Sequence, residues 1–150
     1  MESEHKLDSS GTLTVVKSVK FDAAHILSNH KGLCKNLHGH TYRVETVVKA
    51  KPGAAGDMVI DFKDLKRASE ETIVERFDHA FMYNTCNSAE CEIAAVVAKH
   101  SMRTVALPFR STAENLARYF FGELSARIRG LAAVRVWETA DSCAEYAVGE

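Results

Sequence analysis

The sequence lacks any apolar run close to the roughly 20 residues that a helix needs to span a bilayer. Residues 1–10 are polar and have no apolar core of the kind that marks a signal peptide. Lysine and arginine together number 19 against 20 acidic residues, with no basic stripe and no block of one charge. These absences argue against a membrane protein and against a nucleic-acid-binding protein. We therefore expect a cytoplasmic protein whose residues 1–12 form a flexible polar tail.

The four cysteines form no C-x-x-C pair, and in a reducing compartment they are better explained as free thiols or site residues than as disulfides. Internal repeats, low-complexity segments and a glycine-rich dinucleotide motif are also absent, so nothing points to a nicotinamide or flavin cofactor. What remains is an ordinary globular composition, 46% apolar and 26% charged over 150 residues. That length fits a single domain, residues 13–150, with a core of its own.

Apolar residues alternate with period two in two long segments, residues 13–25 and 38–51. This pattern predicts two strands separated by a polar loop. Residues 52–56 have the proline and glycines of a turn. Shorter strands are predicted at residues 133–139 and 145–148.

Two amphipathic helices are predicted between these pairs of strands. The first runs from residue 62 to about residue 77 with Asp61 as its N-cap. The second begins with a capping box, Ser111-x-x-Glu114, and stops at Gly130. The fold class is therefore α+β, an antiparallel four-stranded sheet with two main helices on one face. The second face and both edges of such a sheet stay uncovered, so we expect a homo-oligomer.

Residues 84–110 form a segment inserted between the two helices. Within it, the pattern predicts a short helix at residues 92–99 and a short strand at residues 103–107. The simplest interpretation is a surface excursion, which can add a strand at one edge of the sheet.

The most informative motif is His38-Gly-His40, with His25 a short way upstream. Histidines two residues apart share one strand face, and a histidine on the preceding antiparallel strand can lie beside them. Three converging imidazoles make a zinc site with an open fourth position, which is typical of catalytic zinc. Gly39 favours this interpretation because a residue without a side chain allows close approach. The plainer alternative is a set of polar strand residues with local hydrogen bonds, and His30 in the loop could also reach the site.

Three further positions are candidates for chemistry. Cys34 lies in the loop that enters the second strand, either as an acid/base thiolate or as a fourth zinc ligand. Asp78-His79 is either an acid/base histidine oriented by a carboxylate or a histidine that interacts with a helix dipole. Glu138 shares a strand face with apolar residues, so its carboxylate needs a lysine, an arginine or a ligand with paired N–H donors.

Taken in order, these motifs resemble the 6-pyruvoyl-tetrahydropterin synthase superfamily from about residue 16 onward. The matching pieces are Phe21-Asp-Ala-Ala-His25, Cys34-x-x-x-His38-Gly-His40, Asp61-Phe62, Asp78-His79, Ser111-Thr-Ala-Glu-Asn115 and Glu138-Thr139. The resemblance implies the tunnelling fold, in which three subunits close a barrel and two trimers stack into a hexamer.

The resemblance also implies roles for individual residues. It implies Zn²⁺ bound by His25, His38 and His40. It implies a proton-transfer group of Cys34, Asp78 and His79. Glu138 would anchor a pterin ring through its 2-amino and N3 edge, and Thr112 falls in a region that approaches the pterin. Because family active sites lie between subunits, Cys34 and Glu138 acting together can come from different chains.

Within the superfamily, the interval between Cys34 and His38 resembles that of the 6-carboxy-5,6,7,8-tetrahydropterin synthases of the queuosine pathway. These enzymes convert 7,8-dihydroneopterin triphosphate to 6-carboxytetrahydropterin, acetaldehyde and triphosphate. Two alternatives stay open: a 6-pyruvoyl-tetrahydropterin synthase, which does not cleave the side chain, and a non-catalytic pterin- or zinc-binding module. Arg110, just before the second helix, either belongs to the surface excursion or helps to bind the triphosphate.

Overall fold

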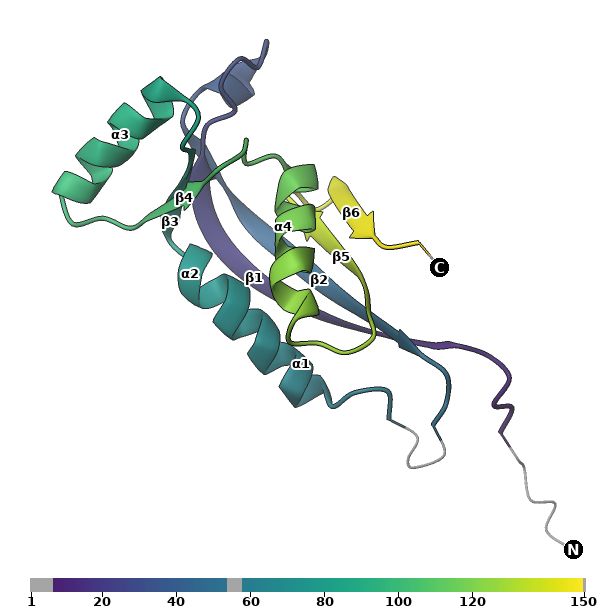
Figure 1. Cartoon of the computed structure of the whole chain (residues 1–150). Coiled ribbons are helices and arrows are strands. Elements are labelled where there is room, and N and C mark those ends of the chain that lie inside the picture. The colour runs from purple at the N-terminus through teal and green to yellow at the C-terminus, as the bar shows by residue number, and fades with distance from the viewer. Residues whose placement is uncertain (1–6, 54–57, 150) are drawn as a thin grey trace, which may run out of the picture.

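The computed structural model describes residues 7–53 and 58–149, and over these ranges the strands form one six-stranded sheet in the order β4-β3-β1-β2-β5-β6 (Figure 1). The strands are β1 (Leu13–His25), β2 (His38–Ala50), β3 (Ala80–Asn84), β4 (Thr104–Leu107), β5 (Leu131–Trp137) and β6 (Cys143–Ala147). The helices are α1 (Phe62–Ser69), α2 (Glu75–Phe77), α3 (Ser88–Lys99) and α4 (Ala113–Ser125), with a 3-10 turn η1 (Leu33–Lys35) and a π-helical turn η2 (Glu70–Val74). Among the described residues, no helix has the length and apolar character to cross a membrane.

The prediction of a four-stranded antiparallel sheet is wrong, because two more strands extend it. β1, β2, β5 and β6 pair antiparallel as predicted, whereas β3 and β4 continue the sheet beside β1 as parallel strands. β4 lies within the predicted strand at residues 103–107, but the pattern does not predict β3. The first three residues of β3 are all buried. A strand buried on both faces shows no alternation that a sequence pattern can detect.

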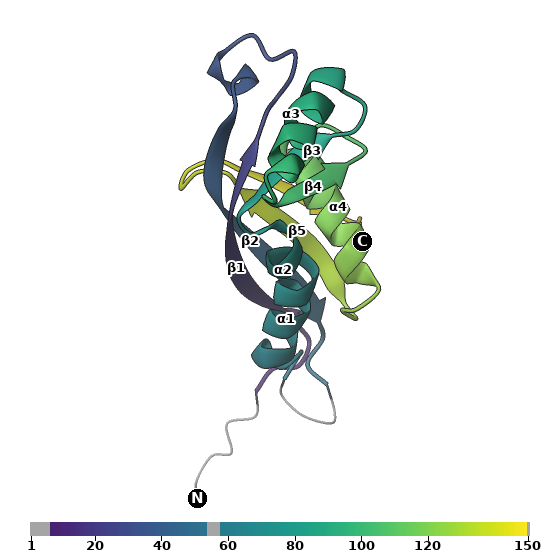
Figure 2. The ribbon, with the colours of Figure 1, turned by 90° about the vertical axis from the view of Figure 1, so that its left-hand side faces the viewer.

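The hairpin of β1 and β2 forms the centre of the sheet. Its strands pair in register from Leu13 opposite Ala50 to His25 opposite His38. One face of the hairpin is buried by the two main helical segments, α1 to α2 and α4, which lie on the same side of the sheet (Figure 2). There Phe21 stacks on Tyr42 with ring centroids 4.9 Å apart. The core therefore covers the strand face that also carries the histidines.

The first predicted helix is confirmed as a continuous helical segment from residue 62 to residue 77, with one π-helical turn in its middle. Asp61 is its N-cap, since its Oδ1 accepts a hydrogen bond of 2.7 Å from the backbone N–H of Lys63. The predicted tail at residues 1–12 and turn at residues 52–56 fall partly on residues 1–6 and 54–57, which lie outside the described residues.

The capping box predicted at Ser111 is wrong by one residue. The N-cap of α4 is Thr112, whose Oγ1 accepts a hydrogen bond of 3.2 Å from the backbone N–H of Asn115. Ser111 cannot serve because it is fully buried and its hydroxyl lies 3.0 Å from Nδ1 of His25. The helix ends at Ser125, before the predicted stop at Gly130.

The segment at residues 84–110 is more than a surface excursion, because it is joined to the loop that carries Cys34. The side chain of Glu90 is buried and accepts hydrogen bonds of 2.6 Å from the Ser28 hydroxyl and from the Asn84 backbone N–H. Ser28 lies in the loop between β1 and β2, so Glu90 connects α3 to that loop.

Replacing Glu90 with alanine should lower the free energy of unfolding by about 1–3 kcal/mol, because two partly buried donors, the Ser28 hydroxyl and the Asn84 N–H, lose their acceptor. Urea denaturation measures the change. Glu92→Ala, on the same helix but exposed, is the matched control and should shift stability by less than about 0.5 kcal/mol. Equal losses in the two variants would contradict the anchoring role of Glu90.

Candidate functional site

Three histidines converge at one end of the central hairpin. His25 ends β1 and His38 begins β2 opposite it, while His40 lies two residues further along β2 on the same face. The Nε2 atoms of His25 and His38 are 3.1 Å apart. One nitrogen from each of the three rings lies within 4.8 Å of the others. We refer to His25, His38 and His40 as the histidine cluster.

Hydrogen bonds at the far side of two rings fix their tautomers. Nδ1 of His25 lies 2.9 Å from the carbonyl oxygen of Ser111, and Nδ1 of His38 lies 2.7 Å from that of Asn36. A carbonyl oxygen only accepts, so each Nδ1 carries the proton and each Nε2 presents a lone pair. Two lone pairs facing each other at 3.1 Å repel unless a cation lies between them. The donor set therefore fits a bound metal ion, with outer hydrogen bonds that orient the ligands.

The electrostatic environment favours the neutral form of His25 and of His40. Burial, and to a smaller degree the charges of His38 and His40, lowers the pKa of His25 to about 4. Burial and the neighbouring His38 also lower the pKa of His40. Neutral imidazole is the form that binds a metal ion, so His25 and His40 do not need to lose a proton first at neutral pH.

Gly39 allows the two strands to approach closely between the histidines. A Cβ atom at this position would lie 3.0 Å from the carbonyl oxygen of Ala23 on β1. Any side chain would therefore push β1 and β2 apart where the register places His25 opposite His38. This contact confirms the expectation of close approach at Gly39.

A cavity of about 350 Å³, here called the Glu138 cavity, brings together several of the predicted residues. Its wall includes Cys34, Arg110, Thr112, Glu114 and Glu138. Oε1 of Glu138 is buried and has no hydrogen-bond partner among the described residues. Burial, followed by the nearby carboxylate of Glu114, raises the pKa of Glu138, and the charge of His38 partly offsets this. The cavity therefore contains a carboxylate that lacks a protein partner and lies near the histidine cluster.

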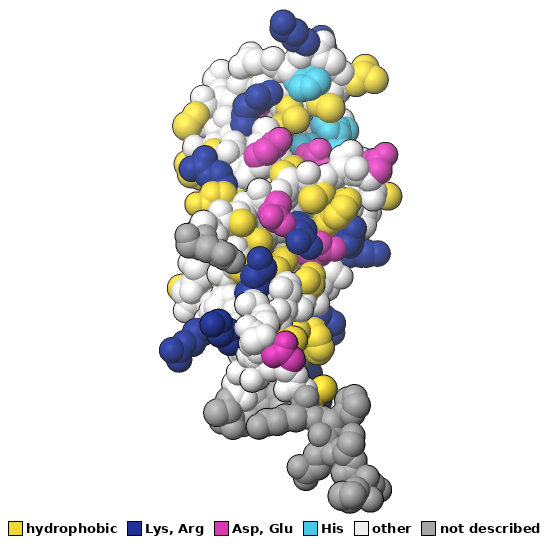
Figure 3. Space-filling model, turned by 90° about the vertical axis from the view of Figure 1, so that its right-hand side faces the viewer, with side chains coloured by type: hydrophobic (Ala, Val, Ile, Leu, Met, Phe, Trp, Pro, Cys, Tyr) yellow, Lys and Arg dark blue, Asp and Glu magenta, His cyan; other side chains and the backbone are white. Residues whose placement is uncertain are grey.

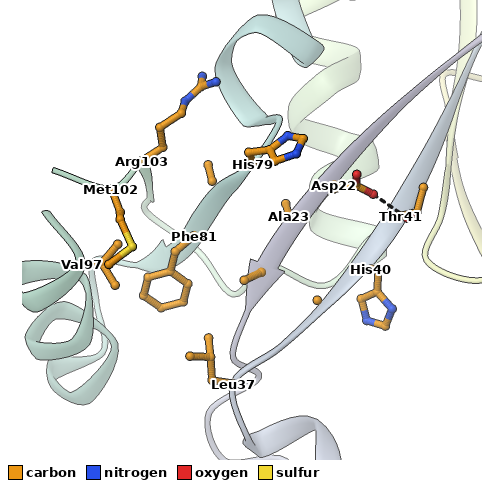
Figure 4. A pocket seen from close by; sticks show the side chains of 13 residues that line it. Asp22, Ala23, Leu37, His40, Thr41, His79, Phe81, Val97, Met102 and Arg103 are labelled. Atoms are coloured by element: carbon orange, nitrogen blue, oxygen red, sulfur yellow. Dashed lines mark hydrogen bonds between the residues drawn. The ribbon is translucent and has the colours of Figure 1, made fainter. Parts of the chain in front are cut away.

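Asp78 and His79 line or border a different depression, a hollow of about 700 Å³ here called the His79 hollow (Figure 4). Nδ1 of His79 lies 2.9 Å from Oδ2 of Asp78. The backbone of Asp22 holds both residues, because its N–H donates to Asp78 over 2.9 Å and its carbonyl accepts from the N–H of His79 over 2.6 Å. The N–H of Asp22 is also the main cause of the lowered pKa of Asp78. The dyad is thus fixed in position by β1.

The hollow has a polar end and an apolar end. Asp22, Thr41 and His79 lie toward one side, and the Oγ1 of Thr41 donates to Asp22 over 2.5 Å (Figure 4). The opposite wall is formed by Leu37, Phe81, Val97 and Met102. His40 also lines this hollow, so one member of the histidine cluster faces the same depression as His79.

The predicted site residues are therefore divided between two depressions of one chain. Cys34, Thr112 and Glu138 share one cavity, which means that a single chain already brings Cys34 and Glu138 together. Asp78 and His79 lie elsewhere, at the other hollow. Cys34 does not belong to the group of three potential metal ligands formed by the histidines.

Sequence reasoning missed four residues that hold the site in place: Asp22, Asn36, Tyr42 and Ser111. Asn36 and Ser111 act through their backbone carbonyls, for which a sequence contains no signal. Tyr42 packs against two rings of the cluster. Its position two residues after His40, on the same strand face, is a signal that could have found it.

The surface beside β6 shows no single dominant charge. In Figure 3, acidic, basic and apolar side chains are interspersed over this face, and histidine side chains gather near the top of the view. This face therefore has no broad electrostatic field of one sign.

Comparisons with known proteins agree on one family. The sequence model of the 6-pyruvoyl tetrahydropterin synthase family matches residues 14–148. A protein of Haemophilus influenzae named 6-carboxy-5,6,7,8-tetrahydropterin synthase is 41% identical over 136 residues, which cover 88% of this chain and 96% of that protein. A protein of Aquifex aeolicus with the same name is 36% identical over 122 residues, covering 75% of each chain.

Solved structures show the same fold at low sequence identity. The 6-pyruvoyl tetrahydropterin synthase of Caenorhabditis elegans superposes with a TM-score of 0.68 at 22% identity, covering 95% of this chain and all 100% of that one. An uncharacterized protein of Wolinella succinogenes superposes with a TM-score of 0.79 at 19% identity, covering 92% of this chain and 99% of that one.

Glu138→Gln should raise the melting temperature at pH 7. Burial raises the pKa of Glu138 in the folded state, so its ionisation at neutral pH costs folding free energy that a neutral amide does not. The free energy of unfolding should rise by about 1 kcal/mol at most, because the half-buried carboxylate remains partly screened by water. It should disappear as the pH falls below about 4, the ordinary carboxyl pKa, where Glu138 is protonated in both states.

Thermal unfolding followed by circular dichroism between pH 3 and pH 8 measures this effect. Glu92→Gln, an exposed glutamate, should leave the melting temperature unchanged at every pH. A lower melting temperature of Glu138→Gln at pH 7 would mean that the carboxylate has a stabilising protein partner.

Proposed function

The chain belongs to the 6-pyruvoyl tetrahydropterin synthase family, and we propose that it is a zinc-dependent 6-carboxy-5,6,7,8-tetrahydropterin synthase of the queuosine pathway, acting in the cytoplasm. One observation carries the proposal: three histidine rings converge closely enough to hold a metal ion, and a cavity of the same chain contains a buried carboxylate oxygen with no partner among the described residues. The name and 41% identity of the Haemophilus influenzae relative favour this activity over that of a 6-pyruvoyl enzyme. The substrate is then 7,8-dihydroneopterin triphosphate.

Glu138 binds the pterin ring. The 2-amino group and N3–H of a pterin form a pair of parallel donors, which match the two oxygens of a carboxylate. The buried Oε1 of Glu138 would gain a partner, and its ionised form would be stabilised by two hydrogen bonds. Thr112 lies on the wall of the same cavity and limits where the ring can lie.

His25, His38 and His40 would hold the metal ion, since each ring offers one nitrogen to a common site. When bound, Zn²⁺ lowers the pKa of a coordinated hydroxyl group and polarises a carbonyl group. The protein orients the ligands through the carbonyl oxygens of Ser111 and Asn36.

Cys34 and His79 move the protons. The Cys34 thiol lines the Glu138 cavity and can exchange a proton with a carbon or oxygen of the substrate side chain. Asp78 contacts Nδ1 of His79, which leaves Nε2 of that ring free to accept or donate a proton on the other side. The two groups thus serve as acid and base, so no redox cofactor is required for an internal rearrangement.

A homo-oligomer completes the site, because one chain leaves Cys34 and His79 in different depressions. β1 pairs with β3 at Ala23 and Ala24 only, so within the described residues most of this edge has no partner strand. The outer edge of β6 carries no further strand in the described sheet. Pairing of these edges between copies would close a three-subunit barrel, and two such trimers would form the hexamer.

Zinc-loaded protein incubated with 7,8-dihydroneopterin triphosphate should give 6-carboxytetrahydropterin and acetaldehyde, identified by mass spectrometry. A product that retains all side-chain carbons would instead indicate a 6-pyruvoyl-tetrahydropterin synthase.

Cys34→Ala should lose at least about a hundredfold in turnover, as expected for a missing acid/base group. Cys86→Ala removes an exposed thiol outside the cavity and is the matched control. Binding of the pterin without any turnover would indicate a binding module.

His38→Ala should lose the bound zinc, because two imidazoles rarely retain the metal through dialysis. The zinc content per chain is measured by mass spectrometry of the metal after dialysis against a weak chelator. His30→Ala, in the loop outside the cluster, should keep one zinc per chain. Retention of stoichiometric zinc by His38→Ala would refute the assignment of the ligands.

A further inference from the structure

Arg110 is the only lysine or arginine among the described residues that line the Glu138 cavity. Its guanidinium group makes no ion pair and no hydrogen bond to a described residue, and its Nε is buried without a partner. Other partly buried arginines of the chain are paired, as Arg135 is with Glu45 and Glu145. An arginine that is partly buried, unpaired and in a cavity indicates that its partner is a ligand.

The backbone holds Arg110 in a fixed place beside the histidine cluster. Its carbonyl oxygen accepts hydrogen bonds from the N–H of Thr112 over 2.9 Å and from Nδ2 of Asn115 over 3.0 Å, at the start of α4. The next residue, Ser111, contacts His25 through both its carbonyl and its hydroxyl oxygen. Arg110 is therefore anchored one residue away from a group that orients a ligand of the metal.

Arg110 and Glu138 line the same cavity without neutralising each other. Each has a buried polar atom with no partner, and the two form no ion pair. The charges that change the pKa of Glu138 are those of Glu114 and His38, and Arg110 is not among them. The guanidinium and the carboxylate thus line one cavity without forming an ion pair with each other. A ligand that fits both has paired N–H donors at one end and negative charge at the other.

We propose that Arg110 binds a phosphate of the substrate's triphosphate group, an inference that rests on the function proposed above. A pterin ring placed on Glu138, with its side chain at the histidine cluster, directs the triphosphate away from Glu138. A guanidinium presents a planar fork of donors that matches two oxygens of a phosphate. The N-terminal end of α4, three residues further on, adds the favourable end of a helix dipole.

The test compares two ligands that differ only in the triphosphate. Binding of 7,8-dihydroneopterin triphosphate and of 7,8-dihydroneopterin is measured by titration on zinc-loaded Cys34→Ala protein, whose turnover should be at least about a hundredfold slower. Adding Arg110→Gln should weaken binding of the triphosphate ligand about tenfold to a hundredfold, the range for a hydrogen bond to a charged group. Binding of the unphosphorylated ligand should not change. Arg110→Lys keeps the positive charge but not the planar pair of donors, and should bind the triphosphate ligand more tightly than Arg110→Gln but less tightly than the Arg110 parent.

Arg118→Gln is the matched control, because it removes an exposed arginine of the same helix that lies outside the Glu138 cavity. It should leave both affinities unchanged. Equal weakening of both ligands by Arg110→Gln would show that Arg110 supports the ring or the fold, and would overturn the inference. If Arg110→Gln left the affinity for the triphosphate ligand unchanged, the inference about Arg110 would be overturned as well, while the proposed function would stand. Absence of any pterin binding by the Cys34→Ala parent would overturn the proposed function and the inference with it.

Discussion

The register of the central hairpin is the constraint on which the site depends. Pairing of β1 with β2 places His25 opposite His38, and period two then places His40 on the same face. A slip of one residue would turn every side chain of one strand to the other face, and the cluster would be lost. Burial of residues such as Tyr42 beneath the helices prevents that slip, because the same face forms the core. The packing that stabilises the fold thus also assembles the histidine cluster.

Polar groups without protein partners mark where the fold gives up stability for binding. The facing lone pairs of His25 and His38, the buried oxygen of Glu138 and the buried Nε of Arg110 all lie around one region. Each would be more stable with a partner, and folding alone supplies none. A metal ion, paired N–H donors and a phosphate would satisfy these groups in turn. Hydrogen bonds and coordination that these groups do not form on folding can form when a ligand binds, and they then contribute to its affinity.

The inserted segment shapes both depressions, although it contributes none of the three residues of the histidine cluster. Through Glu90 it holds the loop that carries Cys34. It also supplies Val97, on α3, and Met102 to the apolar wall of the His79 hollow. Strand β3, just before the segment, occupies only the end of the β1 edge, so the rest of that edge is available for another copy of the chain. The segment therefore belongs to the architecture of the site.

The sequence by itself determined the two long strands, the first helix with its Asp61 cap and the convergence of the histidines. These features depend on the periodicity of apolar residues and on short spacings, both of which can be recognised in the sequence itself. Only the tertiary structure decided the parallel strand β3, the tautomers of the cluster and the capping of α4 by Thr112 in place of Ser111. The contact between Ser111 and His25 joins residues 86 positions apart. Such partners come together only when the chain has folded, so no local sequence pattern can predict the contact.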